Sequence, residues 1–137
     1  MDIKKIEFIS MAGEVARGLN ASIDAEGGGE FVEKIYLDFL EVENEFISGP
    51  EEWLKERMRS AFVFVTEPPV WIEEEPSWAY HEGRPMVFIS QTPLKRSRIT
   101  EEFLTYDEVI YLFGLRKPTS GNGFEMKYVT ITQQLGF

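Results

Sequence analysis

The residue types best suited to chemistry gather in one stretch of the chain, residues 68–91. This stretch holds the only histidine, His81, with Glu82 beside it and a run of glutamates at 73–75 upstream. A histidine close to a carboxylate can act as a general base or as a metal ligand. Adjacent residues on an extended segment point to opposite faces, however, and no nucleophile is implied. We therefore interpret His81 as a solvated loop histidine rather than a catalytic residue.

The glutamates Glu73, Glu74 and Glu75 offer oxygen ligands of the kind that calcium prefers. Calcium loops also need glycine-assisted turns that make the ligands converge, and the DxDxDG pattern of such loops is absent. The chain has one histidine and no cysteine, which excludes multi-histidine and thiolate sites. We expect a solvated acidic loop, no metal, no cofactor and, on balance, no enzymatic activity.

Three aromatic side chains, Trp71, Trp78 and Tyr80, belong to the same proline-rich stretch. They can form a hot spot for a partner or a stacking platform, and they can equally plug the open end of a sheet. Their spacing leaves these alternatives open. Gln91 stands where a strand is expected to end, and its amide can both donate and accept hydrogen bonds. We expect it to hold loop backbone; recognition of a ligand is the alternative.

The formal charge of −10 is unevenly distributed. Residues 1–83 carry 7 basic and 19 acidic side chains, whereas residues 84–137 carry 7 basic and 5 acidic ones. Such a field repels phosphate backbones, so we expect no nucleic-acid partner. It would attract a basic protein, although an acidic surface can also serve solubility alone.

The length of 137 residues, 43% of them hydrophobic, suits a single domain over residues 1–137 with its own core. The N-terminus lacks the apolar core of a signal peptide, and no apolar run of about 18 residues occurs. We therefore expect a cytoplasmic protein without a membrane segment. The sequence does not indicate an oligomeric state.

Alternating apolar and polar residues predict most of the secondary structure as strands. Strands are expected at 3–9, 31–42, 62–65, 86–90, 108–115 and 124–132, and a strand is favoured over a helix at 11–23. Within 31–42, this alternation places Ile35, Leu37 and Phe39 in the core. The glycine run at 27–29 predicts a hairpin loop between two of these strands.

The clearest helix start is the segment Ser-Gly-Pro-Glu-Glu at 48–52. Proline suits the first helical position, and the two glutamates complement the positive end of the helix dipole. The predicted fold class is therefore α+β, with a mostly antiparallel β-sheet and one helix near 50–60. Two predicted strands end in similar sequences, MVFISQ at 86–91 and YVTITQ at 128–133. The similarity is explained either by a weak internal repeat or by chance.

A resemblance to a known family covers residues 68–137. Its motifs are P-x-W at 69–71, Trp78, G-x-P-M-x-F-I-x-Q at 83–91, Y-x-F at 111–113 and a strand that ends in Gln133. This pattern resembles YwqG-like bacterial proteins and some immunity proteins of polymorphic toxin systems, in which a Trp-rich loop precedes such a strand. The resemblance implies a mixed, β-rich fold, a bacterial cytosolic setting and no established enzymatic activity.

The function that we predict is non-catalytic protein binding, in its specific version an immunity-type inhibitor that holds a basic toxin. The partner-binding residues would be Trp71, Glu73, Glu74, Glu75, Trp78 and Tyr80. The alternative is a small-molecule-binding module or hydrolase, with a site at His81, Glu82 and Gln91. This alternative requires a concave pocket lined by His81, Gln91 and a tryptophan. A third class, a scaffold subunit, would dimerise through a hydrophobic sheet face.

Overall fold

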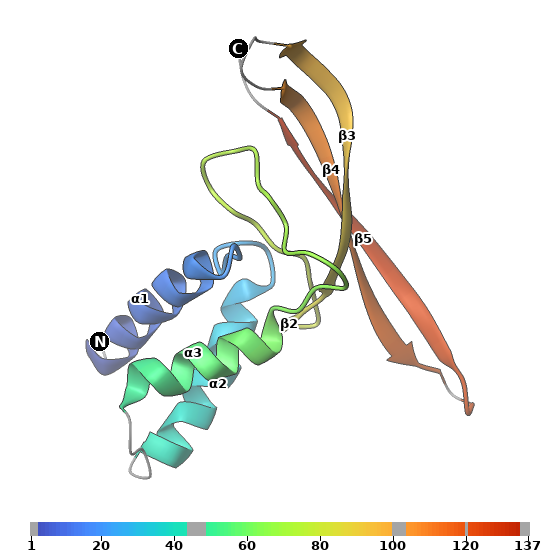
Figure 1. The fold of residues 1–137 in the computed structure, drawn as a ribbon. Helices are drawn as coiled ribbons and strands as arrows, with labels where there is room; N and C mark the ends of the chain where they lie inside the picture. Colours follow the sequence, from blue (N-terminus) through green and yellow to red (C-terminus); the bar gives the residue numbers. More distant parts are fainter. Residues whose placement is uncertain (1–2, 44–48, 100–103, 120, 135–137) are drawn as a thin grey trace.

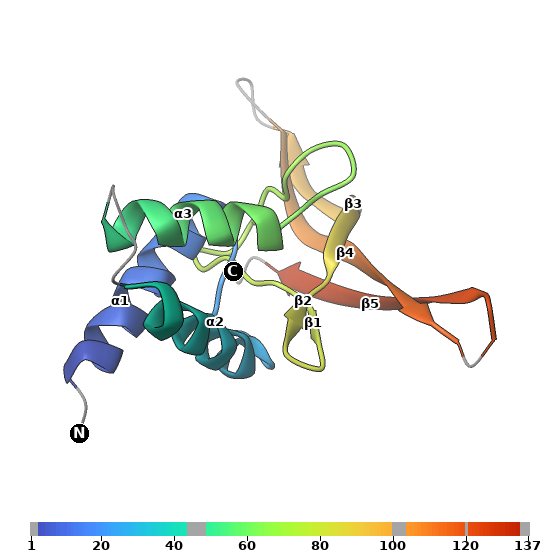
Figure 2. The ribbon, with the colours of Figure 1, turned by 90° about the horizontal axis from the view of Figure 1, so that it is seen from below.

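The computed structural model describes residues 3–43, 49–99, 104–119 and 121–134 of the chain. Its elements are α1 (Ile3–Gly18), α2 (Gly28–Val42), α3 (Pro50–Ala61), β1 (Tyr80–His81), β2 (Arg84–Pro85), β3 (Val87–Ile99), β4 (Leu104–Pro118) and β5 (Phe124–Gln134). The helices form one layer, and β3, β4 and β5 form a twisted antiparallel sheet beside it (Figure 1). The short hairpin β1–β2 lies where the two layers meet (Figure 2). The predicted α+β class with a mostly antiparallel sheet is confirmed.

Helix α1 replaces the strands predicted within the first 23 residues, and those predictions are wrong. Its buried residues Phe8, Ala12 and Ala16 follow one another at intervals of four. That spacing puts all three on one face of a helix. A strand would place Ile6 on the same face as Phe8, two residues later, yet Ile6 is 48% exposed. The alternation that suggested a strand was therefore a short part of a longer helical repeat.

Helix α2 likewise replaces the strand predicted at 31–42. Phe31, Ile35 and Phe39 are buried, again at intervals of four. Leu37, which a strand would have placed in the core with Ile35 and Phe39, is 59% exposed. The apolar residues of this segment fit both periods over a few positions, and burial along the whole segment follows the helical one.

The glycine run starts helix α2 and does not form the predicted hairpin loop. Gly27 takes the N-cap position with a φ of 90°, in the left-handed region that glycine adopts without strain. A Cβ on Gly28 would lie 2.1 Å from the carbonyl oxygen of Ile23, whereas a Cβ on Gly29 would meet open space. The run therefore lets the helix begin directly against the backbone that precedes it.

The other helix and the strands of the second half follow the predictions more closely. Helix α3 confirms the helix predicted at 50–60, with Leu54 and Met58 buried on one face. The strands predicted at 86–90, 108–115 and 124–132 correspond to β3, β4 and β5. Strand β3 begins one residue later than predicted, and all three strands end further along the chain than predicted. The strand predicted at 62–65 is reduced to a single parallel bridge between Phe64 and Phe88.

A chain of aromatic rings joins the helical layer to the sheet. The ring centroids of Phe31 in α2 and Phe62 after α3 lie 5.5 Å apart, and those of Phe62 and Trp78 lie 5.1 Å apart. The ring of Trp78 also contacts that of Phe113 on β4, with centroids 5.1 Å apart, and the ring of Phe113 contacts that of Phe88 on β3, with centroids 5.4 Å apart. Most of these contacts are edge-on, the geometry that aromatic pairs prefer. The core therefore spans both layers without a break.

The two neighbouring glycines provide a test of how α2 begins. Gly28→Ala should lower the free energy of unfolding by about 1–3 kcal/mol, because the new methyl group overlaps backbone that cannot easily move. Gly29→Ala is the matched control in the same helical turn, and should be neutral or stabilising by up to about 1 kcal/mol. Urea unfolding of the two variants measures both. Equal effects would contradict the close contact at Gly28.

Candidate functional site

The segment 68–79, which we call the acidic loop, is held by side chains from all three long strands. On β3, Gln91 accepts a hydrogen bond from the N–H of Val70 at its Oε1 (2.7 Å) and donates one to the Val70 carbonyl from its Nε2 (3.2 Å). On β4, the Tyr111 hydroxyl donates to the same carbonyl (2.8 Å) and accepts from the N–H of Ile72 (3.2 Å). The backbone-holding role expected of Gln91 is therefore confirmed.

Gln133 on β5 holds the next part of the loop. Its Oε1 accepts hydrogen bonds from the N–H groups of Ile72 (3.0 Å) and Glu73 (3.1 Å), and its Nε2 donates to the carbonyl of Glu75 (3.1 Å). Gln133 is only 4% exposed, so water cannot replace these bonds. The two matching strand ends noted in the sequence thus supply two glutamines to one loop. Sequence reasoning noticed the match but gave Gln133 no role.

Trp71 ties the acidic loop to the helical layer. Its ring lies against that of Tyr111, with centroids 4.3 Å apart, and its Nε1 donates to the carbonyl of Asn20 (2.6 Å). Asn20 lies in the turn after helix α1 and has a φ of 61°, and the N–H of Ala21 is bonded back to the carbonyl of Ala16. Trp71 remains partly exposed at the edge of the loop.

Trp78 and Tyr80 point into the molecule instead. Trp78 is 2% exposed and donates from Nε1 to the carbonyl of Met86 (2.8 Å). The Tyr80 hydroxyl donates to the carbonyl of Ser22 (2.5 Å). Burial raises the pKa of the Tyr80 phenol far above its usual range, and the negative charge of Asp24 adds to this effect. The sequence left open whether these aromatic side chains form a binding surface or fill the open end of the sheet. Trp78 and Tyr80 do the second.

The outer side of the acidic loop borders an open hollow of about 560 Å³. The residues that line it are Arg17, Asn20, Pro69, Val70, Trp71, Glu73, Glu74, Glu75 and Pro76. The glutamates at 73–75 are exposed, and a second hollow that adjoins this one at Arg17 and Glu75 adds Asp24. Arg17 lies 3.7 Å from the Asp24 carboxylate and 3.9 Å from that of Glu75. Four carboxylates therefore share this surface with one guanidinium group.

His81 and Glu82 occupy the β1–β2 hairpin, away from this arrangement. His81 belongs to strand β1 and its side chain is only 13% exposed, so the interpretation of it as a solvated loop histidine is wrong. The His81 Nε2 lies 3.7 Å from the Glu82 Oε1 and has no hydrogen-bond partner within the described residues. Neither His81 nor Gln91 lines the hollows along the acidic loop. The structure therefore does not gather His81, Gln91 and a tryptophan around one of these hollows. Across the described ranges, no group of three histidine or acidic side chains could hold a metal ion.

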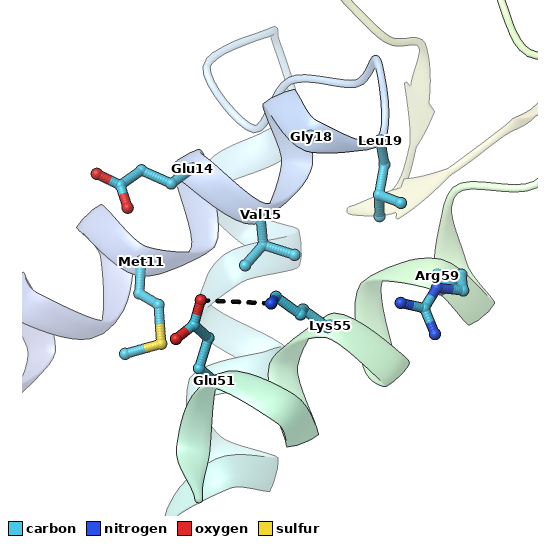
Figure 3. Close-up of a pocket in the computed structure, with 8 residues that line it drawn as sticks. All are labelled: Met11, Glu14, Val15, Gly18, Leu19, Glu51, Lys55 and Arg59. Carbon is cyan, nitrogen blue, oxygen red and sulfur yellow. Dashed lines mark ion pairs between the residues drawn. The ribbon is translucent and has the colours of Figure 1, made fainter.

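Helices α1 and α3 enclose another hollow, of about 310 Å³, which sequence reasoning missed (Figure 3). Its lining residues are Met11, Glu14, Val15, Gly18, Leu19, Glu51, Lys55 and Arg59. The Lys55 ammonium lies 3.5 Å from the carboxylate of Glu51, one turn earlier on α3. Two acidic and two basic side chains balance in charge here, so the hollow offers no net charge to select a ligand. Met11, Val15 and Leu19 follow one another at intervals of four, and this spacing could have indicated an apolar helix face beside the hollow.

No protein-family model, characterised protein or solved structure matches this chain. The resemblance to YwqG-like proteins and immunity proteins therefore stays a prediction. In the parts of the chain that the structure describes, no helix combines the length and the apolar character needed to cross a membrane. The fold and the site together define an α+β domain with a sheet-anchored acidic loop.

Neighbouring glutamines on β5 test this anchoring. Gln133→Ala should lower the free energy of unfolding by about 1–3 kcal/mol, because it leaves the partly buried N–H of Glu73 and C=O of Glu75 without their partner. Gln134→Ala removes the same side chain from an exposed position and should change stability by less than about 0.5 kcal/mol. Urea unfolding gives both values. Similar losses for the two variants would show that Gln133 does not anchor the loop.

Proposed function

We propose that this protein is a non-catalytic binding domain that holds a basic segment of a partner protein at its acidic loop. The observation that carries this proposal is the shared hollow: Trp71 and the glutamates at 73–75 line one open surface. The specific version is an immunity-type inhibitor in a bacterial cytoplasm, which would occlude a basic toxin. The YwqG-like motifs and the charge of −10 support that version.

The chemistry of the hollow favours a lysine or arginine side chain. Carboxylates at Glu73, Glu74 and Glu75 can pair with it, and the partly exposed ring of Trp71 can contact the cation through its face. Each exposed pair contributes only about 0–1 kcal/mol, so the acidic group acts chiefly by steering the partner toward the loop. The Glu75 carboxylate would exchange its long contact with Arg17 for one with the incoming cation.

The anchoring of the loop matters for affinity. Binding is weakened when a loop must become ordered at the same moment. The bonds from Gln91, Tyr111 and Gln133 fix the backbone before any partner arrives. The carboxylates therefore project from a backbone that loses little further conformational freedom. The contact surface in this proposal excludes Trp78 and Tyr80, whose polar atoms are already bonded inside the molecule.

Charge-neutral variants test the proposal with an arginine-rich peptide as the probe. Glu74→Gln combined with Glu75→Gln should weaken binding about fivefold, because two exposed charge pairs are lost. Glu41→Gln combined with Glu56→Gln is the matched control, with the same charge change at exposed positions on α2 and α3. Titration followed by the indole N–H resonances should shift the Trp71 signal. Equal binding by both double variants would overturn the proposed site.

The natural partner can be sought with the same logic. Wild-type protein should capture a basic protein from the source organism, and raised salt should release it. The double variant at Glu74 and Glu75 should capture markedly less than the control variant at Glu41 and Glu56. Capture that is identical for all baits would contradict binding through the acidic loop.

A further inference from the structure

The far end of the β4–β5 hairpin projects beyond the helical layer (Figures 1 and 2). Its large apolar side chains are open to solvent: Phe124 is 59%, Met126 46% and Tyr128 58% exposed. They occupy alternate positions on β5, so they share one face of the hairpin. That face is opposite to the one that carries the buried Tyr111 and Phe113, because the paired residues of β4 and β5 alternate between the two faces.

The outer edge of β5 is also unpaired along this stretch. The sheet order β3-β4-β5 leaves β5 without a neighbouring strand within the described residues. Other edge positions are covered: Phe64 bridges to Phe88 on β3, and the Glu73 carboxylate accepts the N–H of Gln134 on β5 (2.9 Å). No such cover is found along 124–128 in the described part of the chain. A bare edge of this kind is a template for another strand.

The hydrogen bond at Gln134 reveals which backbone groups face outward. Its N–H points away from β4, since it donates to the Glu73 side chain. The β4–β5 register runs without a shift from Gln134 to Phe124. Outward-facing groups alternate in an antiparallel ladder, so the N–H and C=O groups of Phe124, Met126 and Tyr128 also point outward. Water can satisfy these groups in the single chain, and a strand added to the edge would replace that water with a regular ladder of hydrogen bonds.

We propose that a second copy of this chain pairs with this edge, β5 against β5 in antiparallel orientation, about a two-fold axis at Met126. Phe124 then faces Tyr128 of the second copy, and each pair of these residues exchanges backbone hydrogen bonds. Glu125 faces Lys127 of the second copy, and the symmetry forms this ion pair twice. The two three-stranded sheets become one sheet of six strands.

The outward-facing backbone groups of β5 allow several antiparallel registers between two copies, and the charges of the side chains favour the one centred on Met126. An axis at Glu125 places two carboxylates opposite each other, and an axis at Lys127 does the same with two ammonium groups. An axis at Phe124 or at Tyr128 leaves Glu125 and Lys127 without partners of opposite charge on the second copy. Only the axis at Met126 makes the strand complementary to itself, which is what a closed two-fold interface requires. A second copy is therefore the occupant that this edge fits.

This arrangement is independent of the proposed function. The acidic loop contacts β5 at Gln133 and Gln134, whereas the pairing edge is at the other end of the same strand. Both loops of the dimer would stay open. A partner with two basic segments could then bind both, with a gain from multivalency.

Charge reversals on β5 test the proposal in sedimentation measurements over a concentration series at physiological ionic strength. Wild type should form a reversible dimer. Lys127→Glu and Glu125→Lys should each weaken it about tenfold or more, because each turns two ion pairs into two repulsions. The double exchange Glu125→Lys with Lys127→Glu should restore the dimer. Arg59→Glu, at an exposed position on α3, is the control for net charge and should leave it intact.

Mixing the two single variants is the sharpest measurement. The Glu125→Lys chain carries lysine at both positions and the Lys127→Glu chain carries glutamate at both, so an equimolar mixture should form a 1:1 dimer that neither forms alone. Circular dichroism verifies that each variant is folded. The proposal is overturned if wild type stays monomeric at every concentration, if assembly continues beyond a dimer, or if the mixture and the double exchange fail to dimerise.

Discussion

The backbone of the acidic loop is the constraint on which the rest of the arrangement depends. Its prolines and its position outside the sheet leave its N–H and C=O groups without a β-ladder, and buried groups of this kind need partners. Gln91, Tyr111 and Gln133 supply them, one from each long strand. The sheet thus supports the loop through side chains and not through another strand. Trp71 then joins the loop to the end of helix α1.

This support divides the loop into two surfaces with different roles. The inner surface carries Trp78, which completes the aromatic contacts between helices and sheet. The outer surface carries the glutamates at 73–75 around the partly exposed Trp71. Because the inner surface is fixed by packing and hydrogen bonds, the outer charges are held in place at little further cost in entropy. The proposed binding of a basic segment relies on this fixed arrangement of charges.

The second half of the chain was predictable because its strands carry strong, isolated signals. The strand predicted at 86–90 follows Gly83 and Pro85, and Gln91 was expected to hold loop backbone, as it does. Pro93 did not end this strand, because β3 continues through it to Ile99. The first half was not predictable in this way. Over a few residues, the apolar positions around Ile35 and Phe39 satisfy a strand and a helix equally well. The burial pattern over the whole segment, in which Leu37 is exposed, distinguishes the helical period of 3.6 residues from the strand period of two.

The sequence alone determined the α+β class, the helix that starts at Pro50 and the acidic character of residues 1–83, because local capping chemistry and formal charge need no long-range contact. Tertiary structure decided the rest. Whether a tryptophan is buried in the core or borders the surface depends on which elements pack over it. Trp78 is buried and Trp71 is partly exposed, although both belong to the same loop. Gln133 likewise anchors the acidic loop only because folding brings β5 to loop residues that lie 58 to 61 positions earlier in the chain.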